Sequence, residues 1–326
     1  MFTKKRKMRI IVAILISIVS VLVYLNLIGV IFNGSFSFGG GYVYEEFDLP
    51  ETSSLSSVKI AFFGDQGIGT ESKRVLELVK EKEVDLIVLL GDFDYSDSPE
   101  KFKEMYKSVY GNESPLLAVV GNHDVLKWDE YKSWMESLQV PGLNCAGEYG
   151  EVMVCNFGPV SITLSAIGTL PGEHMKFLEN TLPRVDNSWK ICAWHKNHKG
   201  YQAGGKGTEV DMEAYRLCAE NDALIMTGHE HSYSRSYGIG KISEFEVNDR
   251  ESPFDINKSS IVVVSGLGGK SVRDVSDDIK DIWGNIYSKE DDAKAGALIC
   301  EFTNTSADCE FINTDREVID KFKVVN

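Results

Sequence analysis

The chain has 326 residues, a hydrophobic fraction of 43%, a charged fraction of 25% and a formal net charge of −15. These fractions are ordinary for a globular protein, so disorder is excluded for most of the chain, and the length suits one large catalytic domain or two small ones. Residues 1–9 carry bases and no acid, so the rest of the chain is more acidic still, which argues against binding to nucleic acid.

The N-terminal region has the pattern of a membrane anchor. Residues 10–32 are apolar except for Ser17, Ser20, Asn26 and a glycine, and a helix of this length spans the ~30 Å of a bilayer core. No small-residue cleavage site is obvious after the run. The basic residues 1–9 should stay in the cytoplasm. The sequence therefore predicts a single-pass transmembrane signal anchor at the cell membrane with the rest of the chain extracytoplasmic. The alternative is secretion after signal cleavage.

The chain after the anchor divides into a linker and one domain. Residues 33–57 are rich in glycine and serine, and they are interpreted as a flexible linker. Alternating apolar and polar segments begin at residue 58. Neither an internal repeat nor a second linker is apparent, so residues 58–326 are predicted to form one domain.

Six cysteines and four glycosylation sequons fit an exported domain. An even cysteine count permits three disulfides, with 15 possible pairings for six cysteines. Local spacing favours Cys145 with Cys155 and Cys300 with Cys309, because each pair flanks a plausible hairpin turn. The sequons begin at Asn33, Asn112, Asn257 and Asn304.

The domain begins with alternating strands and helices. Short apolar runs at 58–63, 86–90 and 115–120 predict strands, and amphipathic segments at 71–82, 99–109 and 128–138 predict helices. This order favours a parallel sheet covered by helices.

Antiparallel strands are expected further along the chain. A hairpin is predicted at 150–166, helices at 172–182 and 209–221, and strands at 189–194, 223–228, 238–245, 260–264, 297–302 and 308–312. The fold class is therefore α/β with a mixed sheet.

Five of these strands end in residues that can bind metal. The groups that follow them are Gly64-Asp65-Gln66-Gly67, Gly91-Asp92-Phe93-Asp94-Tyr95, Gly121-Asn122-His123-Asp124, His195 and Gly228-His229-Glu230-His231. The carboxyl ends of strands in such sheets gather at one edge, so these side chains are expected to converge. Carboxylate, carboxamide and imidazole ligands suit Zn, Fe or Mn. Their number exceeds the need of one ion and indicates a pair of ions ~3.5 to 4 Å apart.

The five groups, in this order, resemble the signature of calcineurin-like metallophosphoesterases, and the tyrosine three residues after Asp92 is similar to the purple acid phosphatase branch. The resemblance implies a four-layer α/β/β/α fold with a mixed β-sheet sandwich between helices. It covers residues 58 to about 269. Gln66 stands where that branch commonly has tryptophan, and the residues after His195 differ from its usual context.

The resemblance implies a metal-binding role for seven residues. Asp92 would bridge two ions, one held with Asp65, Tyr95 and His231 and the other with Asn122, His195 and His229. A phenol with an ordinary pKa of ~10 ionises only beside a strong Lewis acid, which suggests Fe(III) at Tyr95 and Fe(II), Zn(II) or Mn(II) at the other position. If Tyr95 only packs in its loop, a di-zinc or di-manganese site is expected instead.

The implied reaction is hydrolysis of phosphate monoesters of phosphorylated small molecules by a metal-bound hydroxide. His123 would protonate the leaving group or stabilise the transition state, and Asp124 would orient its imidazole. Asn122, Lys196 and His198 are candidates for contact with the substrate phosphate. The alternatives are a phosphodiesterase acting on nucleotides or lipid head groups, and a binding protein for phosphate ligands that has no catalytic activity.

Overall fold

The computed structural model describes residues 43–326. The predicted cytoplasmic tail and transmembrane anchor, residues 1–32, lie outside the described residues, so they stay predictions. Within residues 43–326, no helix combines the length and the apolar character that crossing a bilayer requires.

The first part of the domain has the predicted βαβαβα order. Strands β1 (Ser57–Phe63), β2 (Leu86–Leu89) and β3 (Leu116–Ala118) are parallel neighbours. Between and after them lie helices α2 (Thr70–Glu81), α3 (Pro99–Tyr110) and α4 (Trp128–Glu136). Pro99 occupies the first turn of α3, where its missing N–H does no harm, and Gly111 ends that helix with a φ of 72°.

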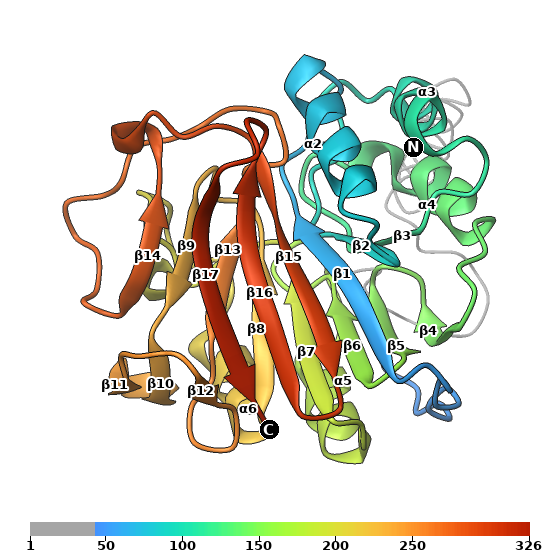
Figure 1. Ribbon diagram of the computed structural model, residues 1–326. Helices are drawn as coiled ribbons and strands as arrows, with labels where there is room; N and C mark the ends of the chain where they lie inside the picture. The colour runs from blue at the N-terminus through green and yellow to red at the C-terminus, as the bar shows by residue number, and fades with distance from the viewer. Residues whose placement is uncertain (1–42) are drawn as a thin grey trace, which may run out of the picture. The chain divides into compact units, whose positions relative to one another are not determined.

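Later strands of the chain extend the same sheet, mainly in antiparallel pairs. The order in this seven-stranded sheet is β12-β17-β16-β15-β1-β2-β3. Strand β15 pairs with β1, so a strand from the last third of the chain lies beside the first strand of the domain (Figure 1). The added strands are β12 (Phe254–Asp255), β15 (Gly296–Thr303), β16 (Ser306–Asn313) and β17 (Val318–Val325).

A second, eight-stranded sheet has the order β14-β9-β13-β8-β7-β6-β5-β4. Its centre is parallel, and its two ends are antiparallel. Its strands are β4 (Leu143–Glu148), β5 (Val152–Phe157), β6 (Val160–Ser165), β7 (Trp189–Trp194), β8 (Ala223–Thr227), β9 (Tyr233–Ser236), β13 (Val262–Ser265) and β14 (Trp283–Tyr287).

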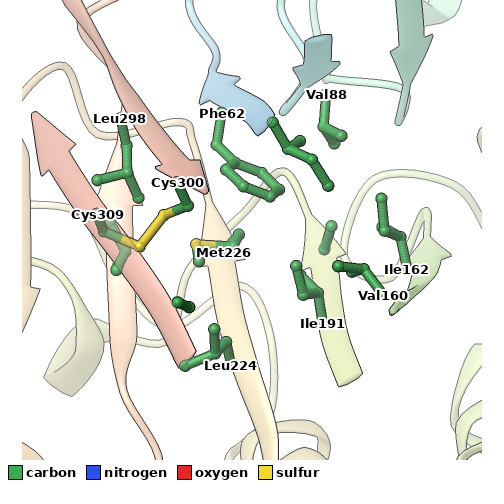
Figure 2. Close-up of a cluster of buried hydrophobic side chains, with 14 of the residues drawn as sticks. Phe62, Val88, Val160, Ile162, Ile191, Leu224, Met226, Leu298, Cys300 and Cys309 are labelled. Carbon is green, nitrogen blue, oxygen red and sulfur yellow. A yellow bond between two sulfur atoms is a disulfide. The ribbon is translucent and has the colours of Figure 1, made fainter. Parts of the chain in front are cut away.

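The two sheets pack face to face around the main hydrophobic core. Side chains that alternate along the strands, such as Phe62, Ile191 and Met226, meet between the sheets (Figure 2). Their neighbours in sequence point the other way, because successive residues of a strand face opposite sides. The sandwich therefore has two more faces to cover.

Helices cover both outer faces. Phe63 of β1 packs in a second core with Val75 of α2 and Phe102 of α3. On the eight-stranded sheet, α6 (Met212–Glu220) packs against β7 and β8, and α5 (His174–Thr181) lies beside α6. The result is four layers, in the order helix, sheet, sheet, helix, as expected.

All three disulfides that six cysteines permit are present. Cys145 pairs with Cys155 and Cys300 with Cys309, which confirms the two predicted pairings. The cysteines of each of these pairs face each other across adjacent strands. The third disulfide joins Cys192 of β7 to Cys218 of α6, and it closes the segment of chain that contains several residues of the site described below.

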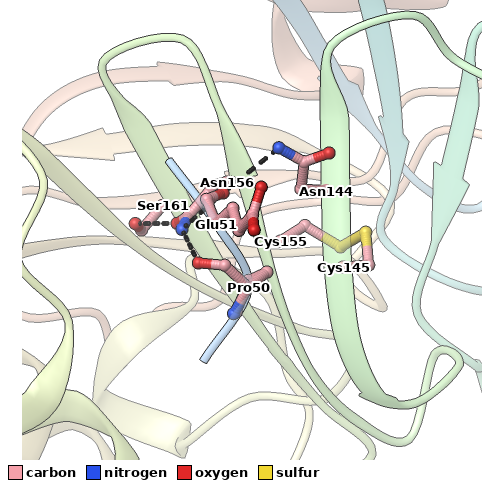
Figure 3. Close-up of a disulfide and its surroundings, with 7 residues drawn as sticks. All are labelled: Pro50, Glu51, Asn144, Cys145, Cys155, Asn156 and Ser161. Carbon is pink, nitrogen blue, oxygen red and sulfur yellow. Dashed lines mark hydrogen bonds between the residues drawn. A yellow bond between two sulfur atoms is a disulfide. The ribbon is translucent and has the colours of Figure 1, made fainter. Parts of the chain in front are cut away.

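Residues 43–56, the described part of the predicted linker, pack against the domain. The side-chain amide of Asn156 donates to the carbonyl of Pro50 at 2.8 Å, close to the Cys145–Cys155 disulfide (Figure 3). Tyr44 is only 7% exposed. This half of the linker is therefore held in place rather than free.

The prediction of one strand at 238–245 was partly wrong. Strand β10 (Gly238–Lys241) ends early, and a short 3₁₀ helix (Ile242–Glu244) precedes β11 (Glu246–Asp249), with which β10 forms a separate two-stranded sheet. Phe245 has a φ of 56°, so the backbone reverses there. The apolar residues of this segment pack against neighbouring elements instead of continuing a strand.

Candidate metal centre

The five motif-bearing strands converge at one end of the sandwich. Strands β1, β2 and β3 belong to one sheet, and β7 and β8 belong to the other. The ends of the two sheets are tied together, because Gly64 N–H donates to the carbonyl of Ser265 at 2.8 Å, and Nδ1 of His195 lies 2.7 Å from the carbonyl of Leu90. Side chains that are far apart in sequence therefore meet across the sandwich.

Four candidate ligands form a first cluster. Nε2 of His195 lies 3.2 Å from Oδ1 of Asp92 and 3.2 Å from Oδ1 of Asn122. The same nitrogen lies 3.1 Å from Nδ1 of His229. One ligand atom each from Asp92, His195 and His229 lies within 4.8 Å of the others. Two imidazoles, a carboxylate and a carboxamide oxygen around one point are a donor set that fits a transition-metal ion.

Three candidate ligands form a second cluster. The Tyr95 hydroxyl lies 2.9 Å from Oδ1 of Asp65 and 3.0 Å from Nε2 of His231. Nε2 of His231 is also 3.2 Å from Oδ1 of Asp65. Asp65 and His231 are almost fully buried. Because the phenol, the carboxylate and the imidazole direct their polar atoms at one another, this donor set also fits a metal ion.

The two clusters are neighbours. His229 N–H donates to Oδ2 of Asp65 at 2.6 Å, which joins a residue of the first cluster to one of the second. Asp92 acts on both. Its charge raises the pKa of His195 against the effect of burial, and together with burial and Asp65 it raises the pKa of Tyr95 far above the ordinary value. Asp92 therefore acts electrostatically on one member of each cluster.

The backbone that presents these ligands is strained. Asp65, Asp92, Tyr95 and His229 have φ values of 57°, 58°, 57° and 69°, in the left-handed region that residues with side chains rarely adopt. Strained residues of this kind persist where the surrounding structure holds them, and they gather at functional sites. At Gly121 a Cβ atom would lie 2.1 Å from the Asp92 nitrogen, so only glycine allows the two loops to approach so closely.

His123 and Asp124 lie at this centre, but not as a pair. The His123 side chain is exposed, and its ring packs on Tyr95 with 4.5 Å between centroids. Asp124 is buried, and its carboxylate accepts main-chain hydrogen bonds from Gly121, Asp92 and Phe93 at 2.7 to 2.8 Å. The prediction that Asp124 orients the His123 imidazole is therefore wrong, because both its oxygens already accept from the backbone.

Asp124 instead shapes the loop that carries Asp92. Replacing Asp124 with alanine would leave three buried N–H donors without a partner, and each such loss costs about 1 to 3 kcal/mol. We expect the Asp124→Ala variant to lose about 3 kcal/mol or more of unfolding free energy, measured by urea denaturation. The control Asp277→Ala removes an exposed carboxylate and should change stability by less than about 0.5 kcal/mol. Equal stability of the two variants would contradict this role.

Two of the residues predicted to contact the substrate have partners within the protein. Nζ of Lys196 is 2.7 Å from Oε1 of Glu209, so a protein carboxylate already neutralises it. His198 packs among the rings of Tyr201, Tyr215 and Phe245, and its Nδ1 accepts from a backbone N–H. Both side chains have partners within the protein, and their contact with substrate stays a prediction. Asn122 remains, since its oxygen points into the first cluster.

Several residues that contact the candidate histidine ligands were not predicted from the sequence. Oε2 of Glu209 lies 2.6 Å from Nε2 of His229, and the Ser271 hydroxyl lies 2.6 Å from Nδ1 of His231. The ammonium of Lys206 donates to the carbonyl of His229. Burial lowers the pKa of Lys206 to about 8. The basic character of this loop was visible in the sequence, but no spacing rule pointed to Glu209 or Ser271.

Gln66, which departs from the expected tryptophan, points away from both clusters. It is fully buried, and its Oε1 accepts from the Tyr106 hydroxyl of α3 at 3.0 Å. The substitution therefore changes the packing under α3 rather than the set of candidate ligands.

The protonation states at the centre predict a pH dependence of metal binding. Burial lowers the pKa of His195, but the charge of Asp92 outweighs it and raises that pKa to about 9. Burial and the neighbouring His195 lower the pKa of His229 to about 4. In the metal-free chain at pH 7, His195 is therefore protonated and His229 is neutral. A metal ion needs both in the neutral form.

Zinc binding at pH 7 is thus expected to release about one proton from His195, and a second from Tyr95 if the phenol ligates. The apparent affinity should rise by about tenfold per pH unit for each released proton, and the part due to His195 should level off near the His195 pKa of about 9. Calorimetry in two buffers of different ionisation enthalpy measures the proton count. Binding without proton release and with an affinity independent of pH would contradict this assignment.

The fold and the two adjacent clusters define a class of protein, a four-layer α/β/β/α domain with a candidate metal centre at the carboxyl ends of its strands. The family model described as calcineurin-like phosphoesterase matches residues 58–233, which contain all seven candidate ligands. The chain belongs to the calcineurin-like phosphoesterase family, a family of hydrolases.

Known relatives support the purple acid phosphatase branch. The chain is 24% identical over 223 residues to probable purple acid phosphatase 20 of Arabidopsis thaliana, a match that covers 60% of this chain and 51% of the relative. Purple acid phosphatase 21 of the same plant is 20% identical over 209 residues, covering 59% of this chain and 48% of the relative. The chain thus spans about half the length of the curated relatives it matches.

Solved structures share the fold. A purple acid phosphatase from yellow lupin seeds superposes with a TM-score of 0.66 at 17% identity, covering 85% of this chain and 55% of that one. GAP50, described as the anchor in the inner membrane complex of Plasmodium, superposes with a TM-score of 0.56 at 15% identity, covering 83% and 89%. At these identities the similarity establishes the fold alone.

Proposed function

We propose that the protein is a metal-dependent phosphatase that hydrolyses phosphate monoesters of small molecules at a dinuclear centre. The observation that carries this proposal is the presence of two adjacent ligand clusters joined by the His229–Asp65 hydrogen bond. Two ions bound there would supply a nucleophile from water at neutral pH and neutralise charge on the phosphoryl oxygens.

Seven residues of the chain would bind the two ions, and Tyr95 limits which metals fit. Asp65, Asp92, Tyr95 and His231 would hold one ion, and Asp92, Asn122, His195 and His229 would hold the other. The phenol of Tyr95 is far from ionising by itself, since burial and the charges of Asp65 and Asp92 raise its pKa. Tyr95 would therefore ligate as a phenolate only to a strong Lewis acid, which favours Fe(III) at its position and Fe(II), Zn(II) or Mn(II) at the other.

His123 is placed to act on the leaving group. Its imidazole is exposed beside Tyr95, while its backbone N–H is fixed to Oδ1 of Asp92 at 2.9 Å. A side chain held at the rim of the centre by its backbone, with a free ring, can donate a proton to the departing oxygen. It is not needed as a ligand, because the other residues fill both clusters.

A panel of esters tests this proposal with the full chain loaded with metal. We expect turnover of p-nitrophenyl phosphate, slower turnover of bis-p-nitrophenyl phosphate, loss of activity on chelation and recovery on addition of Fe, Zn or Mn. Preference for the diester would favour the phosphodiesterase alternative. Absence of turnover with both sites filled would favour a binding protein, an outcome that the complete ligand set argues against.

We also propose that the catalytic domain is extracytoplasmic and anchored in the cell membrane by residues 10–32. The apolar run and the preceding bases support the anchor, and three disulfides in the described domain are typical of an oxidising compartment. Alkaline extraction of membranes should leave the full chain in the pellet, and external protease should reach the domain in intact cells. A chain released by alkali, or protected from protease, would contradict the proposal.

A further inference from the structure

Glu209 links the metal centre to the loop between β7 and α6. Its Oε2 lies 2.6 Å from Nε2 of His229, and its Oε1 lies 2.7 Å from Nζ of Lys196. The carboxylate therefore lies between a candidate ligand and a cation. The Glu209 side chain is 31% exposed and that of Lys196 is 18% exposed, so neither is freely solvated.

The position of Glu209 is built into the fold. Its backbone N–H donates to the carbonyl of Asn197 at 3.0 Å, and the buried Asn197 side chain donates to the Thr227 hydroxyl at 2.8 Å. On the other side, a Cβ atom at Gly168 would lie 2.7 Å from the Glu209 carbonyl oxygen. The backbone that carries this carboxylate is thus fixed between β8 and the loop after β6.

This contact determines which nitrogen of His229 is available to a metal. Nδ1 faces the first cluster, 3.1 Å from Nε2 of His195. For Nδ1 to offer its lone pair, the proton of the neutral ring must be on Nε2, where Glu209 accepts it. A carboxylate in this position fixes the ring and makes the ligating nitrogen more basic.

His229 differs in this respect from the other two candidate histidine ligands. His195 uses its second nitrogen on the carbonyl of Leu90, and His231 uses its own on the Ser271 hydroxyl. Both of those partners are neutral. Among the three histidines, only His229 therefore has a partner that carries a full negative charge.

We propose that Glu209, held by Lys196, is a positioning residue that strengthens metal binding selectively at the cluster of Asp92, Asn122, His195 and His229. The inference rests on the proposed dinuclear centre. It gives Lys196 a role, because its ammonium, 2.7 Å from Oε1, holds the carboxylate where Oε2 reaches His229. A purely structural Lys196–Glu209 pair would stabilise the loop without altering the affinity for metal.

Titration of the metal-free full chain with Zn²⁺ against a chromophoric chelator tests the inference. The unsubstituted chain is expected to bind two ions. Glu209→Ala should weaken one of them by about 10- to 100-fold and leave the other unchanged, and Glu209→Gln, which keeps the shape and loses the charge, should lie between. Lys196→Met should act in the same direction with a smaller effect.

Glu213→Ala is the matched control, since Glu213 is an exposed acid of nearby α6 that pairs with Arg216. It should bind both ions like the unsubstituted chain. Retention of both affinities in Glu209→Ala, or equal weakening at the two sites, would overturn the inference. Thermal unfolding of each metal-free variant separates loss of affinity from loss of fold.

A second measurement needs no metal. Nitrogen NMR of the metal-free chain, at a pH well above the His195 pKa of about 9 so that His195 need not donate to Nδ1 of His229, should find the proton of His229 on Nε2, and in Glu209→Ala both tautomers should be populated. An unchanged tautomer would contradict the inference. A chain that binds two zinc ions in the expected pattern but hydrolyses no ester would contradict the proposed function and leave this inference standing.

Discussion

Replacing Asp92 with asparagine is expected to lower kcat/KM for phosphate monoesters by about a thousandfold or more, which corresponds to about 4 kcal/mol of transition-state stabilisation. Asparagine has the shape of aspartate but lacks the charge that acts on both His195 and Tyr95. It also offers only one oxygen, where a bridging carboxylate offers two. Metal analysis of the purified variant should find fewer than two ions per chain.

Asp94 provides the matched control for this substitution. It is a buried carboxylate of the same loop, 2% exposed, and it accepts hydrogen bonds from the backbone of Ser96 and Ser98, both at 2.7 Å. Asp94→Asn should keep both ions and most of the activity, because Asp94 belongs to neither ligand cluster, although the amide oxygen can accept only one of those two bonds. An Asp92→Asn variant with two bound ions and full activity would refute the bridging role.

Replacing His123 with alanine is expected to leave the metal content unchanged and to reduce kcat in proportion to the difficulty of the leaving group. A positioned general acid contributes about 10²- to 10⁴-fold, and that help matters most when the departing alkoxide is strongly basic. The exposed ring and the backbone hydrogen bond to Asp92 place His123 beside the ligands without making it one.

Two substrates distinguish this role from a general loss of activity. Activity on an alkyl phosphate should fall far more than activity on p-nitrophenyl phosphate, whose leaving group needs little protonation. Equal loss on both would indicate that His123 binds the phosphoryl group instead of protonating the leaving group. Loss of metal would assign it to the ligands.

The sequence predicted the parts of the fold that local pattern determines. Helices α2 and α3 were located to within one residue at each end, because amphipathic spacing and a proline at the start of α3 specify them. Strands such as β9, β14 and β17 were missed. The Tyr233–Ser236 segment is buried but polar, and it is a strand only because it pairs with β13 and β14. Pairing between distant segments leaves little trace in a local pattern.

For the candidate centre, the sequence predicted the ligands but not the residues that contact them. Its seven ligand candidates follow apolar strands, and the structure brings them into two adjacent clusters. The partners of those ligands were not predictable, since Glu209 lies in a loop with no periodic pattern and reaches His229 only through the fold. The role of Asp124 was mistaken because adjacency in sequence to His123 suggested a contact that the turn does not make.

Anomalous diffraction from crystals of the full chain grown with zinc or manganese tests the central claim most directly. The account predicts two peaks ~3.5 to 4 Å apart, one beside Asp65, Tyr95 and His231 and the other beside Asn122, His195 and His229, with the Asp92 carboxylate between them. A single peak, or two peaks without Asp92 in contact with both, would contradict the dinuclear centre on which the proposed hydrolysis depends.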